Sequence, residues 1–372
     1  MPRFTCPYCY DIHDVSGCKI RCSYFNPNNT QQKCYDNSVA KDSLGWISRK
    51  DIGKCLKCHH AKTSICCVET DQEIPQDYLF GESFSVALIG AKASGKSNYI
   101  GVLVNEIRTK MSLPFNCILN TAASNESKKY YDDYYYKPLF KDGYAVPATS
   151  NEVIPPLIFP LRFLDKKNRI KKVAALSFYD TAGENLDSTS EIHIKNRYIP
   201  NASGIILLLD PLQIPAVREK LEGKIPLPAQ NTDTTDLLDQ VTQAIRDVKK
   251  TNKNIKTPIA LVFTKIDVLE EFDILSEDSI LREESEHVRR GVFVEEDYKA
   301  VNNEIMSLLE NFASELQQKL REFTTHSLFG VSSLGKNPEN GIRLNGKVQP
   351  RRVLDPLLWL LAENGYIAKT KR

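Results

Sequence analysis

The sequence has no apolar run long enough to cross a membrane and no marked excess of one charge. Its longest apolar runs, 204–209 and 357–362, fall far short of the roughly 20 residues that a spanning helix needs. The first residues also lack the apolar segment of a secretory signal. A formal net charge of +2 predicts no general attraction to nucleic acid or anionic membranes. We therefore expect a cytoplasmic protein that binds neither membrane nor nucleic acid.

Cysteine is nearly absent beyond the first 67 residues: of the ten in the chain, only Cys117 lies further along. In a chain without a secretory signal, Cys-x-x-Cys pairs indicate metal binding rather than disulfides. Two such pairs, Cys6/Cys9 and Cys55/Cys58, each place two thiolates on a tight turn, which suits tetrahedral zinc. Residues 1–72 are polar and have little apolar core, and zinc would supply roughly 10–16 kcal/mol of folding energy.

The zinc ligands can be grouped in more than one way. We expect one site made of Cys6, Cys9, Cys22 and Cys34, and a second made of Cys55, Cys58 and Cys66 with Cys67 or His60. Cys18 could replace Cys22, and a single ribbon could instead form from the two Cys-x-x-Cys pairs. No open coordination position with a nearby base can be identified. We therefore expect a zinc-ribbon module that serves as a docking platform for protein partners.

A change in composition near residue 73 divides the chain into this Cys-rich module, 1–72, and a larger domain, 73–372. The domain alternates helical stretches with short aliphatic runs, which is typical of a parallel sheet buried on both faces. The expected strands are 83–89, 157–164, 173–179, 205–209, 258–263 and 328–331. Only residues 165–169 join the second strand to the third, too few for a crossover, so these two should form an antiparallel hairpin. We expect an α/β fold with a doubly wound, mostly parallel six-stranded sheet and one antiparallel strand.

Two helical insertions are expected in the domain, near 120–145 and 275–323. The first is rich in tyrosine. In the second, one helical face collects the apolar residues Val301, Ile305, Leu308, Leu309, Phe312, Leu316 and Leu320. This face either packs on the sheet or binds a partner. The last helix should be capped by Asp355 and begin at Pro356.

Residues 90–97 fit the phosphate-loop pattern G-x-x-x-x-G-K-S, known as Walker A, between an apolar strand and a helix. Its glycines let the backbone curl so that successive N–H groups point at phosphate oxygens, and the helix N-terminus adds a positive dipole end. We expect Lys96 to reach the β- and γ-phosphates and the Ser97 hydroxyl to bind Mg²⁺. The expected nucleotide contacts here are Gly90, Lys92, Ala93, Ser94, Gly95, Lys96, Ser97 and Asn98.

Three further motifs follow expected strands. The Asp180 carboxylate can hold Mg²⁺ through water, and Gly183 lets its backbone N–H approach the γ-phosphate. In T-K-I-D, 264–267, the Asp267 carboxylate can accept hydrogen bonds from N1–H and the 2-amino group of guanine, donors that adenine lacks. The backbone of V-S-S-L-G, 331–335, could contact the guanine carbonyl, although a turn of small residues has the same composition. The expected base-binding residues are Thr264, Lys265, Asp267, Ser332, Ser333 and Leu334.

In this order, G-A-K-A-S-G-K-S, D-T-A-G-E, T-K-I-D and V-S-S-L-G resemble the motifs of TRAFAC-class P-loop GTPases, over about residues 83–365. In detail the chain is most similar to the prokaryotic double-GTPase branch, which is associated with conflict, defence or signalling systems. That finer resemblance is carried by the start C-P-Y-C, the form D-T-A-G-E, and R-V-L-D-P-L-L-W-L-L at 352–361. It implies a molecular switch that binds GTP and GDP and hydrolyses GTP with Mg²⁺.

The resemblance also implies a switch threonine that closes over Mg²⁺ and the γ-phosphate, for which Thr109, Thr121 and Thr149 are candidates. Thr149, just before the second strand, is best placed. Many small GTPases carry a glutamine after D-x-x-G, whereas this chain has Glu184, whose carboxylate is not an obvious stabiliser of a developing negative charge. The expected catalytic residues are Lys96, Thr149, Gly183 and Glu184, with Mg²⁺ held by Ser97, Thr149 and Asp180.

Slow hydrolysis without a partner follows from the Glu184 position. Arg197 could supply a cation there, although a surface position on a helix is the expected role. The alternative function is a weakly hydrolysing or non-hydrolysing nucleotide-dependent scaffold. A zinc-ribbon nucleic-acid binder is a third hypothesis, which the near-neutral charge argues against. Protein partners are expected to bind through the zinc module or the helical insertions.

Overall fold

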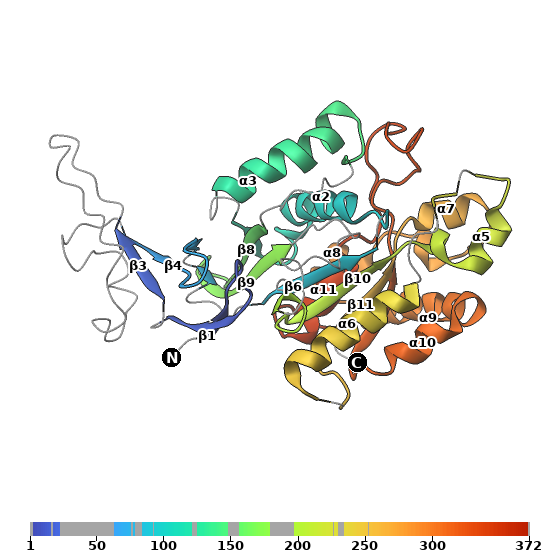
Figure 1. Ribbon diagram of the computed structural model, residues 1–372. Coiled ribbons are helices and arrows are strands. Elements are labelled where there is room, and N and C mark those ends of the chain that lie inside the picture. Colours follow the sequence, from blue (N-terminus) through green and yellow to red (C-terminus); the bar gives the residue numbers. More distant parts are fainter. Residues whose placement is uncertain are drawn as a thin grey trace.

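The structure, a computed structural model, describes residues 3–15, 18–22, 63–75, 77–78, 84–91, 93–120, 125–147, 156–178, 197–225, 227–229, 234–251 and 253–370. The larger part of the chain is built round a central parallel sheet, and the small N-terminal module lies at one end of it (Figure 1). Within the described ranges, no helix is long and apolar enough to span a membrane.

The central sheet has four parallel strands in the order β12-β11-β10-β6. They are β6 (Val86–Gly90), β10 (Gly204–Leu209), β11 (Ile259–Phe263) and β12 (His326–Gly330). Almost every residue in them is buried, which explains their unbroken aliphatic sequences. In register, Leu209 pairs with Phe263 and Phe263 with Gly330, so the loops after these strands leave from the same edge of the sheet.

An antiparallel ladder in the order β7-β8-β9 lies next to β6. Strands β8 (Leu157–Leu164) and β9 (Ile170–Phe178) form the expected hairpin. Strand β7 (Cys117–Leu119) pairs with β8 and was not expected, because three residues are too few to show an alternating pattern. The described strands of the domain therefore form ladders of four and three strands instead of one six-stranded sheet.

The side chain of Tyr198 forms hydrogen bonds to both ladders. Its hydroxyl donates a hydrogen bond to the carbonyl oxygen of Val86 at 2.8 Å and accepts one from the backbone nitrogen of Leu88 at 3.1 Å, both in β6. The same hydroxyl lies 3.4 Å from the carbonyl oxygen of Ser177 in β9. Tyr198 is buried, so this polar bridge is shielded from solvent.

The helices surround the parallel sheet. They are α2 (Lys96–Glu106), α3 (Asn125–Tyr131), α5 (Pro215–Leu221), α6 (Thr234–Lys249), α7 (Ile266–Glu271), α8 (Glu286–Arg290), α9 (Glu295–Phe312), α10 (Ser314–Leu320) and α11 (Asp355–Glu363). Single turns are η2 (Ile107–Met111), η3 (Asp132–Tyr136), η4 (Pro138–Asp142), η5 (Pro211–Gln213) and η6 (Ile280–Arg282). In Figure 1, α2 and α3 lie on one side of the parallel sheet and α6, α9 and α10 on the other, which is a doubly wound arrangement.

The second helical insertion consists mainly of α9 and α10. They are separate helices because Ala313, with φ −155° and ψ 56°, leaves helical geometry between them. Helix α9 packs against β12, and α10 packs against α6 and α9. The fully buried residues of the expected apolar face are Val301, Ile305, Leu309, Leu316 and Leu320. This face is therefore part of the domain core, as the first of the two alternatives predicted.

The start of α11 differs from the expectation. Asp355 is not the N-cap but the first helical residue, and Leu354 before it already has near-helical angles. The Asp355 carboxylate makes no cap hydrogen bond and instead accepts one from Arg352 Nη1 at 3.0 Å. The carboxylate binds Arg352, three residues earlier, and not the backbone N–H groups of the first turn. An unpaired buried charge would cost more free energy than a missing cap hydrogen bond.

The N-terminal module contains a hairpin and a short sheet. The hairpin is β1 (Arg3–Thr5) with β2 (Ile12–Asp14), and the sheet is β3 (Lys19–Cys22), β4 (Thr63–Cys66) and β5 (Glu73–Ile74). Strand β5 lies beyond the expected boundary at residue 72 and pairs with β4 of the module. The apolar core of the module also includes Ile158 of β8 and Ala175 of β9. The module and the β8–β9 hairpin therefore share one core.

We predict that Leu309→Ala lowers the free energy of unfolding by about 2–5 kcal/mol, because a fully buried leucine in the contact between α9 and β12 would be replaced by a cavity. Leu308→Ala makes the same chemical change one position away, where the side chain is half-buried, and should cost markedly less. Urea denaturation of both variants measures the difference. Equal losses would contradict this orientation of α9.

Candidate functional site

The loop between β6 and α2 has backbone geometry that few residue types adopt. Ala93, with φ 62°, and Gly95, with φ 82°, both lie in the left-handed region. At Gly90, a Cβ would stand only 2.4 Å from Ser94 Oγ, so a larger residue there would displace the Ser94 hydroxyl. These residues turn the chain sharply just before Lys96 begins α2. The turn is of the kind that presents backbone N–H groups to an anion at a helix N-terminus.

Two side chains of this loop suit a phosphate ligand. Lys96 stands in the first turn of α2 and is only 8% exposed, so its charge acts where solvent screening is weak. The hydroxyl of Ser94 is buried and has no hydrogen-bond partner within the described part of the chain. Ser97 follows Lys96 and is half-buried. A buried hydroxyl, a shielded ammonium and a helix N-terminus form a donor set that fits a phosphate group.

The T-K-I-D motif, which follows β11, holds the phosphate loop, which follows β6 on the other side of β10. The Thr264 hydroxyl, at the end of β11, lies 2.9 Å from the Ser94 carbonyl oxygen and 3.1 Å from that of Leu209. Lys265, with φ 54°, donates from Nζ to the Ala93 carbonyl oxygen at 3.0 Å. The expected phosphate-binding and base-binding segments are thus joined directly through their side chains.

Asp210 also belongs to this site and was not expected from the sequence. It follows β10, its side chain is 1% exposed, and its Oδ2 lies 2.6 Å from Lys265 Nζ. Its Oδ1 accepts a hydrogen bond from the Leu212 backbone nitrogen at 2.9 Å. The pair therefore fixes the direction of the Lys265 side chain. A carboxylate directly after an apolar strand was the available signal, but its partner comes from another strand.

Asp267 and the last motif are brought together as well. The Ser332 hydroxyl donates to Asp267 Oδ1 at 2.6 Å and accepts a hydrogen bond from the Gly335 backbone nitrogen at 2.9 Å. This orients the carboxylate at the start of α7. Ser333 and Leu334 lie in the same loop and are half-buried. The second carboxylate oxygen can take part in recognition of a base while Ser332 holds the first.

The remaining expected nucleotide contacts lie mostly outside the described residues: these are Lys92, Thr121, Thr149, Asp180, Gly183 and Glu184. Strand β9 ends two residues before Asp180 and lies beside β6. Asn98 Oδ1 accepts a hydrogen bond from the Val146 backbone nitrogen at 2.9 Å, which ties α2 to the segment that leads to Thr149.

Thr109 can be removed from the candidates for the switch threonine. It lies in η2, at the opposite end of α2 from the phosphate loop, and its hydroxyl donates to the Asn105 carbonyl oxygen at 2.8 Å. At 1.5 Å per residue it is about 20 Å from Lys96.

Four potential metal ligands cluster in the N-terminal module: Cys6, Cys9, His13 and Cys67, all within 4.8 Å of one another. Cys9 Sγ lies 2.9 Å from His13 Nε2, and Cys67 Sγ lies 3.6 Å from Cys9 Sγ. Hydrogen bonding to Cys67 raises the pKa of Cys6 to about 12. The pKa of Cys67 is lowered by its hydrogen bond with Cys6 and, next, by its hydrogen bond with Cys9.

This grouping differs from the expected ones. Cys67, which we expected with Cys55 and Cys58, lies with Cys6 and Cys9, because β4 returns the chain beside the first Cys-x-x-Cys pair. His13 was not expected, although its position four residues after Cys9 was the available signal. Cys66, the last residue of β4, is buried outside the cluster. The expected ligands Cys34, Cys55 and Cys58, the alternative His60, and the side chain of Cys22 lie outside the described part.

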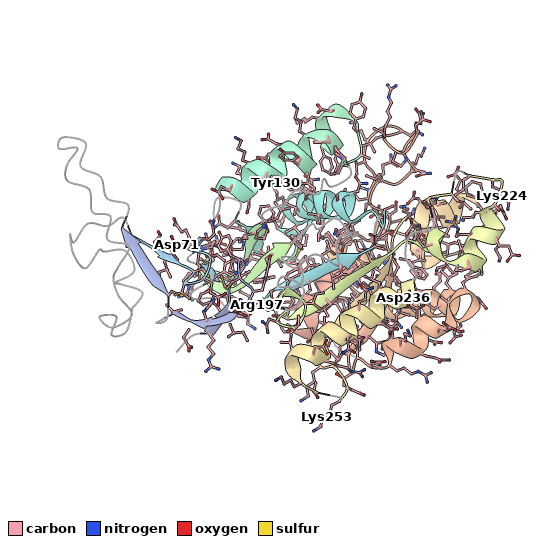
Figure 2. All side chains as sticks on the ribbon, in the orientation of Figure 1. Asp71, Tyr130, Arg197, Lys224, Asp236 and Lys253 are labelled. Carbon is pink, nitrogen blue, oxygen red and sulfur yellow. The ribbon has the colours of Figure 1, made fainter. Side chains whose placement is uncertain are left out.

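The knuckle of the module docks on the turn at 197–202. Arg197 Nη1 forms ion pairs with Asp11 Oδ2 at 2.8 Å and Glu69 Oε2 at 2.6 Å, and it lies between the module and the domain in Figure 2. Asn201 Nδ2 donates to the Tyr10 carbonyl oxygen at 2.9 Å, and the Tyr10 ring packs on Tyr198 with a centroid separation of 4.7 Å. Arg197 therefore binds carboxylates of the module and is not directed at a phosphate.

Comparison with known proteins gives a family and several more distant likenesses. A family model described as Double-GTPase 2 matches residues 85–333, more than half of the chain. A Mycolicibacterium smegmatis protein named "Putative ESX-1 scaffolding and assembly protein SaeC" is 25% identical over 325 residues, which cover 79% of this chain and 78% of that protein.

Two solved structures are similar at low identity. The Arl6 BBS3 small GTPase from Trypanosoma brucei, with the bound nucleotide analogue GppNp, has a TM-score of 0.31 at 11% identity and covers 77% of this chain and 99% of that one. The GTP-bound GTPase-like domain of Ski7 from S. cerevisiae has a TM-score of 0.36 at 12% identity and covers 76% and 50%.

We predict that the wild-type chain binds GDP far more tightly than ADP, and that Asp267→Asn shifts the preference toward XDP. XDP is xanthosine diphosphate, whose base carries a carbonyl where guanine carries the 2-amino group. The asparagine side chain keeps one oxygen to accept the hydrogen bond from Ser332. Its amide N–H can then donate to the xanthine carbonyl. Isothermal titration with GDP, XDP and ADP measures this. Asp273→Asn, an exposed position just after α7, is the matched control and should change nothing. Equal affinity of the wild type for GDP and ADP would overturn the guanine assignment.

Proposed function

Because the chain belongs to the Double-GTPase 2 family, we propose that it is a molecular switch that binds GTP with Mg²⁺ and hydrolyses it to GDP and phosphate. One observation carries this proposal. The phosphate loop and the T-K-I-D motif are joined by the contacts of Thr264 with Ser94 and of Lys265 with Ala93. These contacts support a single site in which the loop binds the phosphates and Asp267, two residues after Lys265, binds the base.

Each residue of the site has a distinct role in the proposed reaction. Lys96 binds the β- and γ-phosphates and the loop backbone surrounds the β-phosphate. Ser97, Asp180 and Thr149 would hold Mg²⁺, which neutralises the charge that develops on the phosphate oxygens. Gly183 donates its backbone N–H to the γ-phosphate. A water attacks the γ-phosphorus. At the same time the bond between the γ-phosphorus and the β–γ bridging oxygen breaks, and that oxygen leaves with GDP.

Glu184 sets the expected rate. A model glutamate titrates at about 4.3, so the side chain is ionised at neutral pH unless it is strongly desolvated. Beside the triphosphate, a carboxylate raises the energy of the developing negative charge. Intrinsic turnover is therefore slow, and a partner that supplies an arginine would accelerate it, by about 10³–10⁵ in other GTPases.

Single-turnover hydrolysis of GTP by the full chain tests the proposal. Glu184→Gln should keep or raise the basal rate, because a neutral amide orients water without adding negative charge. Lys96→Ala should bind neither GTP nor GDP, while Lys110→Ala, in η2 beyond the far end of α2, should keep the wild-type nucleotide affinity. A large loss of rate in Glu184→Gln with intact GTP affinity would show that the carboxylate is itself the water-positioning group.

The second candidate function is a nucleotide-dependent scaffold that hydrolyses GTP weakly or not at all. It is favoured by Glu184 and by the scaffolding role in the name of the Mycolicibacterium smegmatis relative. Tight GTP binding with no release of phosphate, alone or with added cell extract, would support this function over the switch. A place in a bacterial conflict, defence or signalling system belongs to the proposal in either case.

We also propose that the N-terminal module binds zinc through Cys6, Cys9, His13 and Cys67. Three sulfur atoms and one imidazole nitrogen make up four ligands, the number and type that tetrahedral structural zinc sites use. The remaining cysteines of the module could form a second site. Reduced thiols at such a site point to the cytoplasm as the place of action. Protein partners would dock on this module or the helical insertions, and nucleic acid is not an expected ligand because the net charge is +2.

The zinc prediction can be checked by elemental analysis of purified protein. Cys67→Ser should release one zinc ion per chain relative to wild type and should loosen the module, because a ligand of the site is lost. Cys117→Ser, a buried cysteine of the domain, is the matched control and should retain the wild-type zinc content. Wild-type protein without metal, or with these cysteines oxidised to disulfides, would contradict the site.

A further inference from the structure

Residues 349–351 hold the expected guanine loop through the backbone. The Ser332 backbone nitrogen donates to the Arg351 carbonyl oxygen at 3.1 Å, and the Arg351 nitrogen donates back to Ser332 at 2.8 Å. The Gln349 nitrogen donates to the Leu334 carbonyl oxygen at 3.0 Å. At Gly335, with φ 87°, a Cβ would stand 2.5 Å from the Gln349 carbonyl oxygen. The position of the loop therefore depends on where this segment lies.

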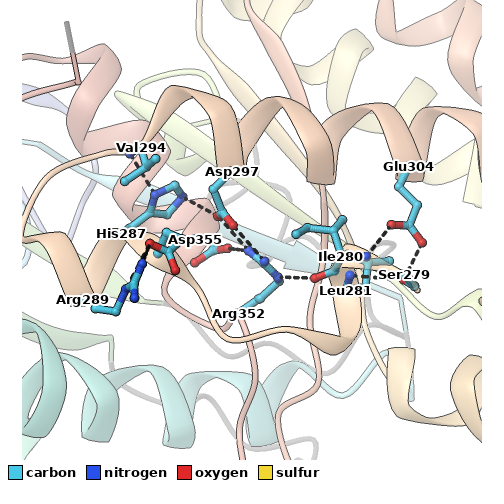
Figure 3. Close-up of polar contacts among 11 residues, drawn as sticks. Ser279, Ile280, Leu281, His287, Arg289, Val294, Asp297, Glu304, Arg352 and Asp355 are labelled. Carbon is cyan, nitrogen blue, oxygen red and sulfur yellow. Dashed lines mark hydrogen bonds and ion pairs between the residues drawn. The ribbon is translucent and has the colours of Figure 1, made fainter. Parts of the chain in front are cut away.

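The next residue, Arg352, is fixed by a buried polar network. Its side chain is fully buried and donates to both oxygens of Asp297 in α9, at 2.9 and 3.0 Å. It also donates to Asp355 Oδ2 at 3.0 Å and to the Ile280 carbonyl oxygen at 3.2 Å (Figure 3). Four hydrogen bonds from one guanidinium leave Arg352 a single orientation, and they join α9, α11 and η6 at one point.

The backbone of Arg352 is itself unfavourable. Its φ of 56° is left-handed, which costs an arginine free energy and persists only when the surroundings hold it in place.

His287 also lies beside this network. His287 Nε2 lies 3.7 Å from Asp297 Oδ2, and its Nδ1 accepts a hydrogen bond from the Val294 nitrogen at 3.0 Å. The His287–Asp297–Asp355 group has the composition of a cation site, but the Arg352 guanidinium already binds both carboxylates.

Segment 349–353 also contacts both parts of the nucleotide site. Tyr99 of α2 donates from its hydroxyl to the Val353 carbonyl oxygen at 3.1 Å, one turn after the phosphate loop. Arg351 forms an ion pair with Glu270 of α7, the helix that begins beside Asp267. Segment 349–353 thus contacts α2, which follows the phosphate loop, α7, which contains Asp267, and the expected guanine loop at 331–335.

We propose that Arg352 is a positioning residue for guanine recognition: bound to Asp297 and Asp355, it fixes the backbone that holds Ser332 against Asp267. The proposal rests on the proposed function, since it concerns how the base is selected. Ser332 donates to Asp267 Oδ1 at 2.6 Å, so a displaced loop would turn the carboxylate away from the base. The phosphate loop itself is held by Thr264 and Lys265, whereas Tyr99 meets the segment one turn further along α2, so phosphate binding should be kept.

The test is the ratio of GDP to ADP affinity in the full chain, with inorganic pyrophosphate and Mg²⁺ as a probe that lacks the base. Arg352→Lys keeps the charge but loses the planar fork, and it should lower the GDP-to-ADP ratio by about 2- to 30-fold. Its affinity for pyrophosphate should stay within the error of wild type. Asp355→Asn removes one charge from the network and should change the ratio in the same direction by a smaller factor.

Two controls separate positioning from loss of stability. Leu309→Ala weakens the same helix that carries Asp297, but about three turns further along it, so it should lower stability and leave the ratio unchanged. Arg321→Lys makes the same substitution at an exposed arginine and should change neither quantity.

An unchanged ratio in a folded Arg352→Lys protein would overturn the proposal, as would parallel losses for GDP and pyrophosphate. Should Arg352→Lys not fold, Asp355→Asn decides by the same ratio. A wild type that does not prefer GDP to ADP refutes the proposed function itself, which is a distinguishable result.

Discussion

The parallel register of four strands is the constraint on which the rest of this structure depends. Because β6, β10, β11 and β12 run in the same direction and end close to one edge, the loops that follow them meet there. The loops need not cross the sheet to reach one another, because the strand order already brings them together. The phosphate turn, Asp210, the T-K-I-D motif and the V-S-S-L-G loop are neighbours simply because their strands are neighbours, and side-chain contacts such as Lys265 with Asp210 then set the fine geometry.

The site is held by buried charges, and this is a costly way to fix a loop. Moving Arg352 and its two carboxylates out of water carries a desolvation penalty that their attraction only partly offsets, so an apolar cluster of the same volume could be as stable. What apolar packing does not provide is direction. A guanidinium with defined partners on three elements fixes the backbone beside it in one orientation, and the Asp210–Lys265 pair does the same for a single side chain.

Much of the fold could be predicted because buried parallel strands have unbroken aliphatic sequences and because residues 165–169 are too short for anything but a hairpin. Strand β7 could not, since three residues carry no period and the strand is defined by its pairing with β8. In the site, the glycines and lysine of the phosphate loop follow a fixed local pattern. Asp210 follows no such pattern, because a carboxylate after a strand can have many roles. Its role here, the ion pair that orients Lys265, depends on the approach of Lys265 from the end of β11. For the same reason the Cys6/Cys9 pair was recognisable as a possible metal site, while the return of Cys67 to it depends on how β4 pairs.

The core shared between the N-terminal module and the β8–β9 hairpin has a consequence for the order of assembly during synthesis. The knuckle with Cys6 and Cys9 leaves the ribosome first, but the apolar partners that complete its core, Ile158 and Ala175, follow about 150 residues later. At translation rates of about 5–20 residues per second, that interval lasts on the order of ten seconds. During that interval, the thiols and apolar side chains of the module are exposed and must not react or associate with other chains. Early binding of a metal would shorten that exposure, so the supply of zinc in the cell would act on the yield of folded protein rather than on its activity once folded.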